Sequence, residues 1–507
     1  MLELCSLDDE DEYYLLDYDT TQYDLIVDNV KNTLPQHFIW GTATAAYQVE
    51  GSYNIDGRSL SIWDTFCDKP GKIIDSSNGN TACDHYNRFK EDIQLLQKFG
   101  CKAYRLSFSW SRIVPDGFQK STVNLLAIQH YHRVLDLLLS CGIQPWVTLY
   151  HWDLPQVLYD NYGGLLNTQK FVEDFKYYAD VCFREFGAKV KHWMTFNEPH
   201  TFCKQGFGYD GPHAPGHTDD RSRSDRGNPG IEVWVAGHST LLAHAYAVDL
   251  YRKKYQPIQK GKISIVLNSD WAEPFSDSSN DIDAAQRKMD FFLGWFADPI
   301  YLSGDYPPSM RLQLGDRLPK FTAKESAMLF KSTDFFALNS YTSQYIKDKG
   351  PAVPPLNDLD GNTVATPFDS EGKLIGFKGA ASWLYDVPWG FSKLIIYIHN
   401  RYHGPAIVIT ENGFCSPGET DISNSIQDVT RVHYFNGYLS NLVKAVTEYG
   451  VKINGYFAWS LMDNFEWARG YTERFGITFV DFKTMKRTPK MSFSFLQGFF
   501  DKAIRGV

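Results

Sequence analysis

Eight short runs of apolar and β-branched residues recur along this chain, and stretches with helical periodicity separate them. The helical spacing is clear in Phe89, Ile93 and Leu96, ahead of Gly100, a residue that often ends a helix. Strands that alternate with helices are typical of a parallel sheet, and a closed barrel needs eight of them. The chain is therefore predicted to be an α/β protein, a (β/α)8 TIM barrel in a single domain. The predicted strands span residues 38–45, 103–110, 144–152, 192–197, 262–269, 335–343, 406–413 and 453–461, and helices are predicted over 84–99, 125–139, 168–186 and 231–255.

Three longer stretches, 206–230, 270–290 and 344–382, show no clear periodicity and are predicted to be loops. Loops of this length in a barrel are usually functional, so we expect them on the catalytic face. For 270–290, a tolerated surface insertion is an equally good interpretation. The barrel domain is expected over 34–500, with a short tail at 501–507.

The first 33 residues hold ten acidic side chains and one lysine, so most of the net charge of −10 belongs to this extension. It is expected to be flexible, with a docking segment as the alternative. The remaining body has 50 acidic and 49 basic residues, which leaves no basic excess for nucleic acid.

The compartment is predicted from what the sequence lacks. No apolar run approaches the 18 or so residues of a membrane span, and the first residues have no secretory pattern. The eight cysteines show no C-x-x-C pair, which suits a reducing cytoplasm. No cluster of histidine, cysteine and aspartate has metal-ligand spacing, so no metal site is expected.

Two of the predicted strands end on a glutamate. Glu198 follows the run 192–197, and Glu411 ends the run that begins at 406. A single glutamate at a strand end is most often solvated or salt-bridged. The chemistry of barrel enzymes, however, takes place at the carboxyl ends of the strands. Other polar and aromatic side chains stand at or just beyond the strand ends, namely Gln48, Arg105, His151, Asn197, Asn339, Tyr341, Trp459, Glu466 and Trp467.

Two carboxyl groups together with aromatic side chains are what a glycosidase needs in its active site. Cleavage of a glycosidic bond needs one carboxylic acid to protonate the departing oxygen and one carboxylate to face the anomeric carbon. A separation of about 5–5.5 Å gives retention and a wider one gives inversion, and the sequence leaves this open. Arg105 is expected beneath the pair, next to Glu411. The charge of Glu411 is expected to raise the pKa of Glu198 into the range of a general acid.

Several motifs carry a resemblance to a known family, and together they span essentially residues 34–500. They are Tyr47-Gln48-Val49-Glu50-Gly51, His151-Trp152-Asp153-Leu154-Pro155, Thr195-Phe196-Asn197-Glu198-Pro199, Ile409-Thr410-Glu411-Asn412-Gly413 and Trp459-Ser460-Leu461-Met462-Asp463-Asn464-Phe465-Glu466-Trp467. In this order they resemble the signature set of glycoside hydrolase family 1. The chain looks most like the intracellular fungal β-glucosidases of that family.

The resemblance implies a retaining mechanism without a metal or cofactor. It makes Glu198 the general acid/base and Glu411 the nucleophile, while Tyr341 would hydrogen-bond the nucleophile. Arg105 and Asn339 would support the two glutamates, and Trp383 is a candidate for an aromatic wall on the aglycone side, together with Trp389. The residues that would bind the non-reducing sugar are Gln48, His151, Asn197, Trp459, Glu466 and Trp467.

The expected activity is that of a β-glucosidase acting on short oligosaccharides or aryl and alkyl glucosides. The expected partner is thus a small carbohydrate, and the oligomeric state stays open. Plant thioglucosidases of the family carry glutamine where this chain has Glu198, and Glu466 would repel the phosphate of a 6-phosphoglycoside. A β-galactosidase, a β-fucosidase or a transglycosidase of the same fold remains an alternative. So does a non-catalytic member that binds sugar or protein.

Overall fold

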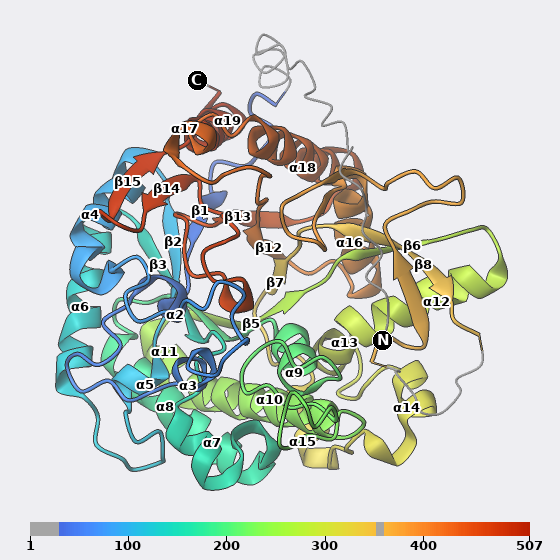
Figure 1. The fold of residues 1–507 in the computed structure, drawn as a ribbon, viewed down its shortest axis with the longest axis horizontal. Helices are drawn as coiled ribbons and strands as arrows, with labels where there is room; N and C mark the ends of the chain where they lie inside the picture. Colours follow the sequence, from blue (N-terminus) through green and yellow to red (C-terminus); the bar gives the residue numbers. More distant parts are fainter. Residues whose placement is uncertain (1–29, 351–358, 507) are drawn as a thin grey trace.

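The computed structural model describes residues 30–350 and 359–506. Its centre is a closed barrel of eight parallel strands (Figure 1), which confirms the predicted fold. Each strand falls within the run predicted for it. In chain order they are β1 (Ile39–Ala43), β2 (Ala103–Ser107), β3 (Gln144–Tyr150), β4 (His192–Asn197), β5 (Lys262–Asn268), β7 (Phe336–Asn339), β12 (Ile407–Asn412) and β13 (Ile453–Trp459).

Helices cover the outside of the barrel (Figure 1). The predicted helices are confirmed, and the one predicted over 231–255 consists of α10 followed by a π-helical turn, Tyr251–Tyr255. The longer helices are α4 (His85–Phe99), α6 (Leu125–Ser140), α8 (Thr168–Phe186), α9 (Pro199–Phe207), α10 (Glu232–Leu250), α12 (Ser279–Met289), α16 (Pro388–Arg401), α18 (Val429–Tyr449) and α19 (Met491–Phe500). The shorter ones are α2 (Ala46–Val49), α3 (Ile62–Cys67), α5 (Trp110–Ile113), α7 (Gln156–Tyr162), α11 (Gln256–Gln259), α13 (Trp295–Tyr301), α14 (Pro308–Leu314), α15 (Ala323–Leu329) and α17 (Ile422–Ser425).

The barrel strands are buried on both faces, which explains why they form continuous apolar runs in the sequence. All residues of β2, β7 and β12 are buried. Inside the barrel, the Trp146 ring stacks on His192 with ring centroids 3.8 Å apart, and outside it Phe196 stacks on Phe175 of α8 at 4.2 Å. A buried aromatic side chain of this kind contributes about 1.5–3 kcal/mol to folding.

The prediction that 270–290 and 344–382 are loops is wrong in part. Both stretches contain strands: β6 (Trp271–Pro274), β8 (Ser343–Asp348) and β9 (Thr363–Thr366) form a small sheet outside the barrel, and α12 packs on it (Figure 1). These strands are too short to show a period in the sequence, and their pairing partners lie far away along the chain. The prediction for 206–230 is confirmed from residue 208 onward: 208–230 contain neither helix nor strand, while 206 and 207 belong to α9. Two further pairs of short strands are β10 (Phe377–Lys378) with β11 (Tyr385–Asp386) and β14 (Thr478–Asp481) with β15 (Lys486–Pro489).

The folded unit extends slightly beyond 34–500 at both ends. The backbone N–H of Asn32 donates to the carbonyl of Lys502 at 3.2 Å, and that of Leu34 donates to Ala503 at 3.0 Å. Val30 is buried, and α19 continues as a turn over 501–505 whose Ala503 and Ile504 are buried as well. The rest of the acidic extension, 1–29, lies outside the described residues.

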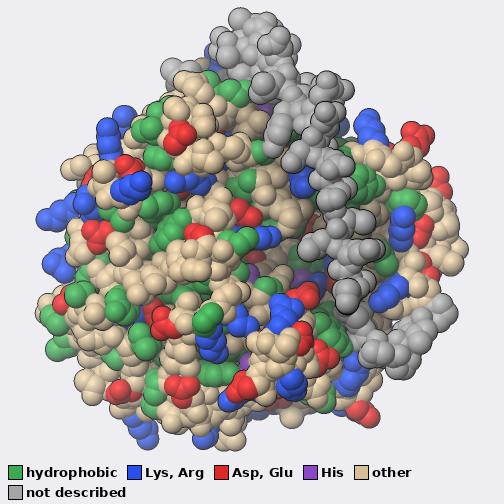
Figure 2. Space-filling view, in the orientation of Figure 1, with side chains coloured by type: hydrophobic (Ala, Val, Ile, Leu, Met, Phe, Trp, Pro, Cys, Tyr) green, Lys and Arg blue, Asp and Glu red, His purple; other side chains and the backbone are tan. Residues whose placement is uncertain are grey.

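On the face seen in Figure 2, lysine and arginine side chains are interspersed with aspartate and glutamate. This face presents no stripe of one charge that would suit a polyanion. In the part of the chain that the structure describes, no helix is long and apolar enough to cross a membrane.

Candidate active site

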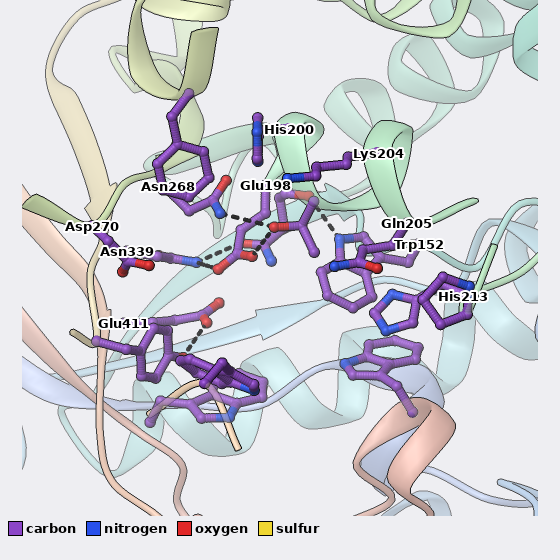
Figure 3. Close-up of a pocket in the computed structure, with 18 of the residues that line it drawn as sticks. Trp152, Glu198, His200, Lys204, Gln205, His213, Asn268, Asp270, Asn339 and Glu411 are labelled. Carbon is purple, nitrogen blue, oxygen red and sulfur yellow. Dashed lines mark hydrogen bonds between the residues drawn. The ribbon is translucent and has the colours of Figure 1, made fainter. Parts of the chain in front are cut away.

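A cavity of about 630 Å³ opens at the carboxyl ends of the barrel strands, and both glutamates line it (Figure 3). The structure therefore brings together side chains that the sequence places hundreds of residues apart. The predicted site residues that line the cavity are His151, Asn197, Glu198, Asn339, Tyr341, Trp383, Glu411, Trp459, Glu466 and Trp467. Gln48 and Arg105 are not among the lining residues, but each contacts one of them, Glu466 and Glu411 respectively.

Glu198 stands where β4 turns into α9. Its φ of 50° lies in the left-handed region, and Pro199 begins the helix directly after it. The Asn339 amide donates to Oε1 of Glu198 at 2.7 Å, and the Thr201 hydroxyl donates to Oε2 at 2.9 Å. Burial raises the pKa of Glu198 to about 8, and the nearby charge of Glu411 adds to the rise. At neutral pH this group is therefore mainly a carboxylic acid, able to give up a proton.

Glu411 lines the same cavity in a different environment. Its Oε1 forms a buried ion pair with the Arg105 guanidinium, and its Oε2 accepts a hydrogen bond of 2.7 Å from the Tyr341 hydroxyl. Burial and the charge of Glu411 raise the pKa of Tyr341 well above its usual value, so this hydroxyl keeps its proton. The two contacts orient the Glu411 carboxylate and leave it accessible from the cavity.

Asn197 connects the two glutamates through its side chain. Its Oδ1 accepts from Arg105 at 2.6 Å and from Asn339 at 3.1 Å, and these two donors also bind Glu411 and Glu198 respectively. One continuous set of hydrogen bonds thus fixes the positions of the two carboxyl groups relative to each other. Such a shared set fixes the position of each member more tightly than isolated contacts do.

Asn197 also determines which ring nitrogen of His151 carries the proton. Its Nδ2 donates to Nε2 of His151 at 3.1 Å, so the proton of the neutral ring sits on Nδ1. Burial, with the charge of Arg105, lowers the pKa of His151 well below its usual value. The buried Nδ1 has no hydrogen-bond partner among the described residues. It is therefore a donor available to a ligand in the cavity.

Gln48 and Glu466 form a second polar group at the cavity. The Gln48 amide nitrogen donates to Asn464, to the Phe465 carbonyl and, at 3.3 Å, to Oε2 of Glu466. Within the described residues its buried Oε1 accepts no hydrogen bond. Burial and then neighbouring acidic groups raise the pKa of Glu466 well above its usual value. Together the pair offers both donors and acceptors to hydroxyl groups.

Aromatic rings complete the walls of the cavity. His151 lies parallel to Trp459 with ring centroids 5.9 Å apart and to Trp467 at 6.0 Å. Trp383 lines the cavity, is 41% exposed and lies edge-on to Tyr341 at 5.8 Å. The expectation for Trp389 is wrong: it is absent from the lining and packs against a small apolar cluster of Ile375, Tyr385 and Val387.

Comparison with known proteins identifies the family of the chain. The profile of the family described as "Glycosyl hydrolase family 1" matches residues 30–503. The chain belongs to glycosyl hydrolase family 1.

Relatives in this family are similar to the chain over almost its whole length. "Beta-glucosidase 1B" of Phanerodontia chrysosporium is 48% identical over 92% of this chain and 86% of the relative. "Beta-glucosidase 34" of rice is 47% identical over 91% of each chain.

Solved structures of family 1 are similar as well. A β-glucosidase from the fungus Humicola insolens in complex with glucose superposes with a TM-score of 0.90 at 48% identity, covering 92% of this chain and 98% of that one. The rice β-glucosidase Os3BGlu6, in a covalent complex with glucose, gives a TM-score of 0.89 at 46% identity, with 92% and 98% coverage.

Sequence reasoning missed several residues of this family 1 cavity. Thr201, which binds Glu198, is itself held by the Asn268 amide at 2.8 Å. A signal for Thr201 was present, because it follows Glu198 by three residues on a helix that Pro199 begins. Lys204 lines the cavity from the same helix, while Lys288 reaches it from α12. The sequence holds no comparable signal for Lys288, since its position depends on how α12 packs.

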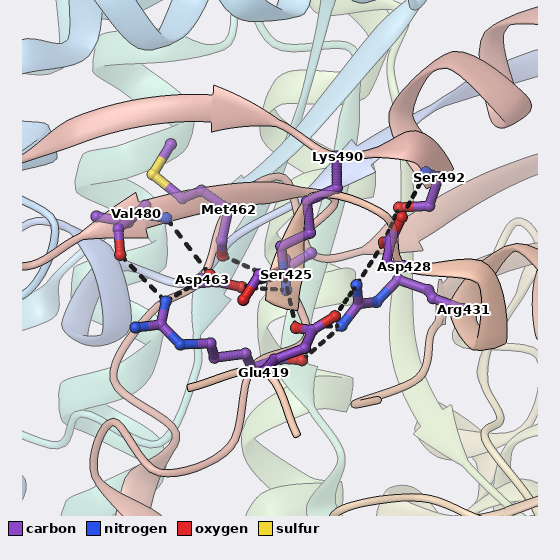
Figure 4. A network of polar contacts seen from close by, with 12 residues as sticks. Glu419, Ser425, Asp428, Arg431, Met462, Asp463, Val480, Lys490 and Ser492 are labelled. Carbon is purple, nitrogen blue, oxygen red and sulfur yellow. Dashed lines mark hydrogen bonds and ion pairs between the residues drawn. The ribbon is translucent and has the colours of Figure 1, made fainter. Parts of the chain in front are cut away.

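A buried network of charges holds the segment that carries Trp459 and Glu466 (Figure 4). At its centre, Asp463 accepts from Lys490 at 2.9 Å and from Arg474 at 2.6 Å. Lys490 also binds Glu419 at 2.7 Å, and Glu419 pairs with Arg431. With Asp428, the network has three acidic and three basic side chains, so its charges balance. This balance allows charged groups to remain buried.

Replacing Lys490 with methionine is expected to lower the free energy of unfolding by about 3–5 kcal/mol, because Asp463 and Glu419 would then carry uncompensated buried charge. Urea unfolding followed by tryptophan fluorescence measures the change. Lys253→Met is the matched control: this lysine is 75% exposed and pairs with Asp249 at the surface, so it should change stability by less than about 1 kcal/mol. Equal losses in the two variants would contradict the structural role of the network.

Proposed function

We propose that this chain is a retaining β-glucosidase, in which Glu411 is the nucleophile and Glu198 the general acid/base. One observation carries the proposal: two carboxyl groups that line one cavity have opposite environments. Glu198 is buried, with its pKa raised to about 8, whereas Glu411 is paired with Arg105 and hydrogen-bonded by Tyr341. A pair of this kind provides both an acid and a nucleophile near neutral pH.

In the first step Glu411 attacks the anomeric carbon while Glu198 gives its proton to the glycosidic oxygen. The bond from the anomeric carbon to the leaving group breaks, and a glucosyl ester on Glu411 forms. Tyr341 donates to Glu411 in the free enzyme, and weakening of that hydrogen bond accompanies the loss of charge on the carboxylate. Arg105 stays in place and polarises the ester as a leaving group for the second step.

The same charge change prepares the second step. Once Glu411 is esterified, its negative charge no longer raises the pKa of Glu198, so that pKa falls and Glu198 becomes a better base. It then takes a proton from a water molecule whose oxygen attacks the anomeric carbon. The bond to Glu411 breaks, and both carboxyl groups return to their starting states. Two displacements on opposite faces leave the configuration unchanged. When a sugar hydroxyl takes the place of water, the same step is a transglycosylation.

The non-reducing sugar is proposed to lie against Gln48, His151, Asn197, Trp459, Glu466 and Trp467. Nδ1 of His151 and Oε1 of Gln48, which have no partner among the described residues, supply a donor and an acceptor for its hydroxyls. Trp459 offers a flat face for the C–H groups of the ring. Glucose is favoured as this sugar because the relatives named above are β-glucosidases and one of the similar structures holds glucose.

The test is the hydrolysis of p-nitrophenyl β-D-glucoside with the anomer of the first product identified by NMR. We expect turnover with β-glucose formed first, and a higher kcat/KM for the glucoside than for the galactoside or fucoside. α-Glucose as the first product would contradict retention. If well-folded protein turned over none of the three glycosides, the hydrolase function would be wrong and a sugar- or protein-binding role would take its place.

The protein is further proposed to act on its small carbohydrate substrate in the cytoplasm. In the ranges 30–350 and 359–506, all seven cysteines are free thiols, which suits a reducing compartment. Cell fractionation with antibody detection tests this location, and recovery with secreted material would contradict it.

A further inference from the structure

Two lysine ammonium groups line the cavity on the side of Glu198. Thr201 and Gln205 follow Glu198 by three and seven residues, so they share one face of α9, and Lys204 lies beside them (Figure 3). Lys204 is six residues, or about 9 Å of helix, beyond Glu198. Lys288 reaches the same cavity from the end of α12. Because the general acid faces the leaving group, these side chains border the space of the aglycone.

The two lysines share a carboxylate, that of Asp360. Lys204 Nζ and Lys288 Nζ bind the same atom, Oδ1 of Asp360, at 2.6 and 2.5 Å. The lysine side chains are 26% and 14% exposed, so water screens them only in part. Each ammonium has three N–H donors. Among the described residues, the acidic side chain that each ammonium contacts is Asp360, through one hydrogen bond. The group of three therefore carries one net positive charge and spare donors.

Asp210, whose charge also reaches Lys204, is 88% exposed and pairs with Arg223 at 3.9 Å, so solvent and that arginine screen it. Two other neighbouring titratable groups are uncharged at slightly acidic pH. Burial lowers the pKa of His200 well below its usual value, so this residue is neutral. Burial raises the pKa of Asp270, which also lines the cavity, to about 7. Apolar surface lies beside the charges: the Lys288 ammonium is 5.4 Å from the centroid of the Phe292 ring, and Ile346 lines the same wall.

We propose that this wall, formed by Lys204, Lys288 and Phe292, selects β-glucosides whose aglycone combines an apolar ring with a carboxylate. The inference rests on the proposed β-glucosidase function and names the substrate class of that same site. The ring of the aglycone packs against Phe292 and Ile346. The carboxylate accepts hydrogen bonds from the two ammonium groups in addition to Asp360, which brings the local charge to zero.

The test compares two glucosides of one phenol, 3-(4-hydroxyphenyl)propanoic acid and its primary amide. The two-carbon spacer keeps the acidity of the phenol leaving group nearly equal, so the ratio of kcat/KM values reports recognition of the carboxylate. At pH 6 and low salt the wild type is expected to prefer the acid about fivefold, and about 0.5 M salt should reduce this preference. Lys288→Gln and Lys204→Gln should bring the ratio close to one.

Charge variants separate recognition of the carboxylate from damage to the fold. For each variant, kcat/KM for the acid is divided by kcat/KM for the amide, so a general loss of activity cancels. Lys288→Arg should keep the preference, and Asp360→Asn should increase it, since two positive charges then face the ligand unpaired. Lys253→Gln, at an exposed lysine far along the chain, should leave the ratio unchanged.

A wild-type ratio near one, with p-nitrophenyl β-D-glucoside still hydrolysed, would overturn this inference alone. Failure to hydrolyse any of the glucosides would overturn the proposed function, and this inference with it.

Discussion

Glu411→Gly is expected to lower kcat for p-nitrophenyl β-D-glucoside by on the order of 10⁴-fold or more. The variant has no carboxylate to attack the anomeric carbon, and Arg105 and Tyr341 lose the group they orient. Azide is small enough for the vacated space and should attack from the same side as Glu411. It should therefore restore turnover and give α-glucosyl azide, because the reaction then has a single displacement. Absorbance at the nitrophenolate band and NMR of the azide product measure both effects.

Glu371→Gly is the matched control for this prediction. Glu371 lies on the surface of the loop before β10, so its loss should leave the rate within about twofold of wild type. Circular dichroism and the unfolding midpoint establish that the Glu411 variant is folded. If it retained more than about one per cent of the wild-type rate, or if azide gave the β-anomer, Glu411 would not be the nucleophile.

Glu198→Ala is expected to affect substrates according to their leaving group. For cellobiose, whose departing oxygen needs a proton, kcat/KM should fall about 10²–10⁴-fold. For 2,4-dinitrophenyl β-D-glucoside, whose leaving group needs none, kcat/KM should change little. Its kcat should still fall, because no base activates water in the second step. Azide needs no base, so it should raise kcat and give β-glucosyl azide.

The pH dependence tests the same assignment. Glu198 must be protonated for the first step, and its pKa lies near 8, so the active fraction decreases as the pH rises through that value. The kcat/KM of the wild type on cellobiose should therefore decline above about pH 8. The Glu198→Ala variant, measured on the same substrate at its lower rate, should lack this alkaline decline. An unchanged decline in the variant would assign the ionisation to another group. Equal losses of kcat/KM on both substrates would contradict the acid role of Glu198.

Much of the fold was predictable because its signal is local. Each barrel strand is buried on both faces, so each is an apolar run that stands out against the helical spacing around it. The small sheet of β6, β8 and β9 was missed for the opposite reason. Its strands have four to six residues, and what stabilises them is pairing between distant segments, which no local window contains.

The candidate site was predictable to the level of residues, although most of its atomic contacts were not. Glu198 and Glu411 end strands that must share one rim of the barrel, so their meeting follows from the topology. The contact between Arg105 and Glu411 was predicted, and the structure contains it. The rise in the pKa of Glu198 was expected from the charge of Glu411, yet burial is the larger cause. Burial depends on everything packed around the group, and therefore only the folded chain determines it.

The sequence alone thus determined the order of the strands along the chain, the residues at their ends and the kind of chemistry those residues can perform. These features can be predicted because periodicity and position within a strand depend on neighbouring residues. The tertiary structure alone decided which atoms meet. It placed Asn197 between Arg105 and Asn339, left Nδ1 of His151 without a partner among the described residues, and brought Lys288 beside Lys204. Hydrogen bonds and ion pairs act over a few ångströms, and such distances exist only after segments far apart in the chain have packed together.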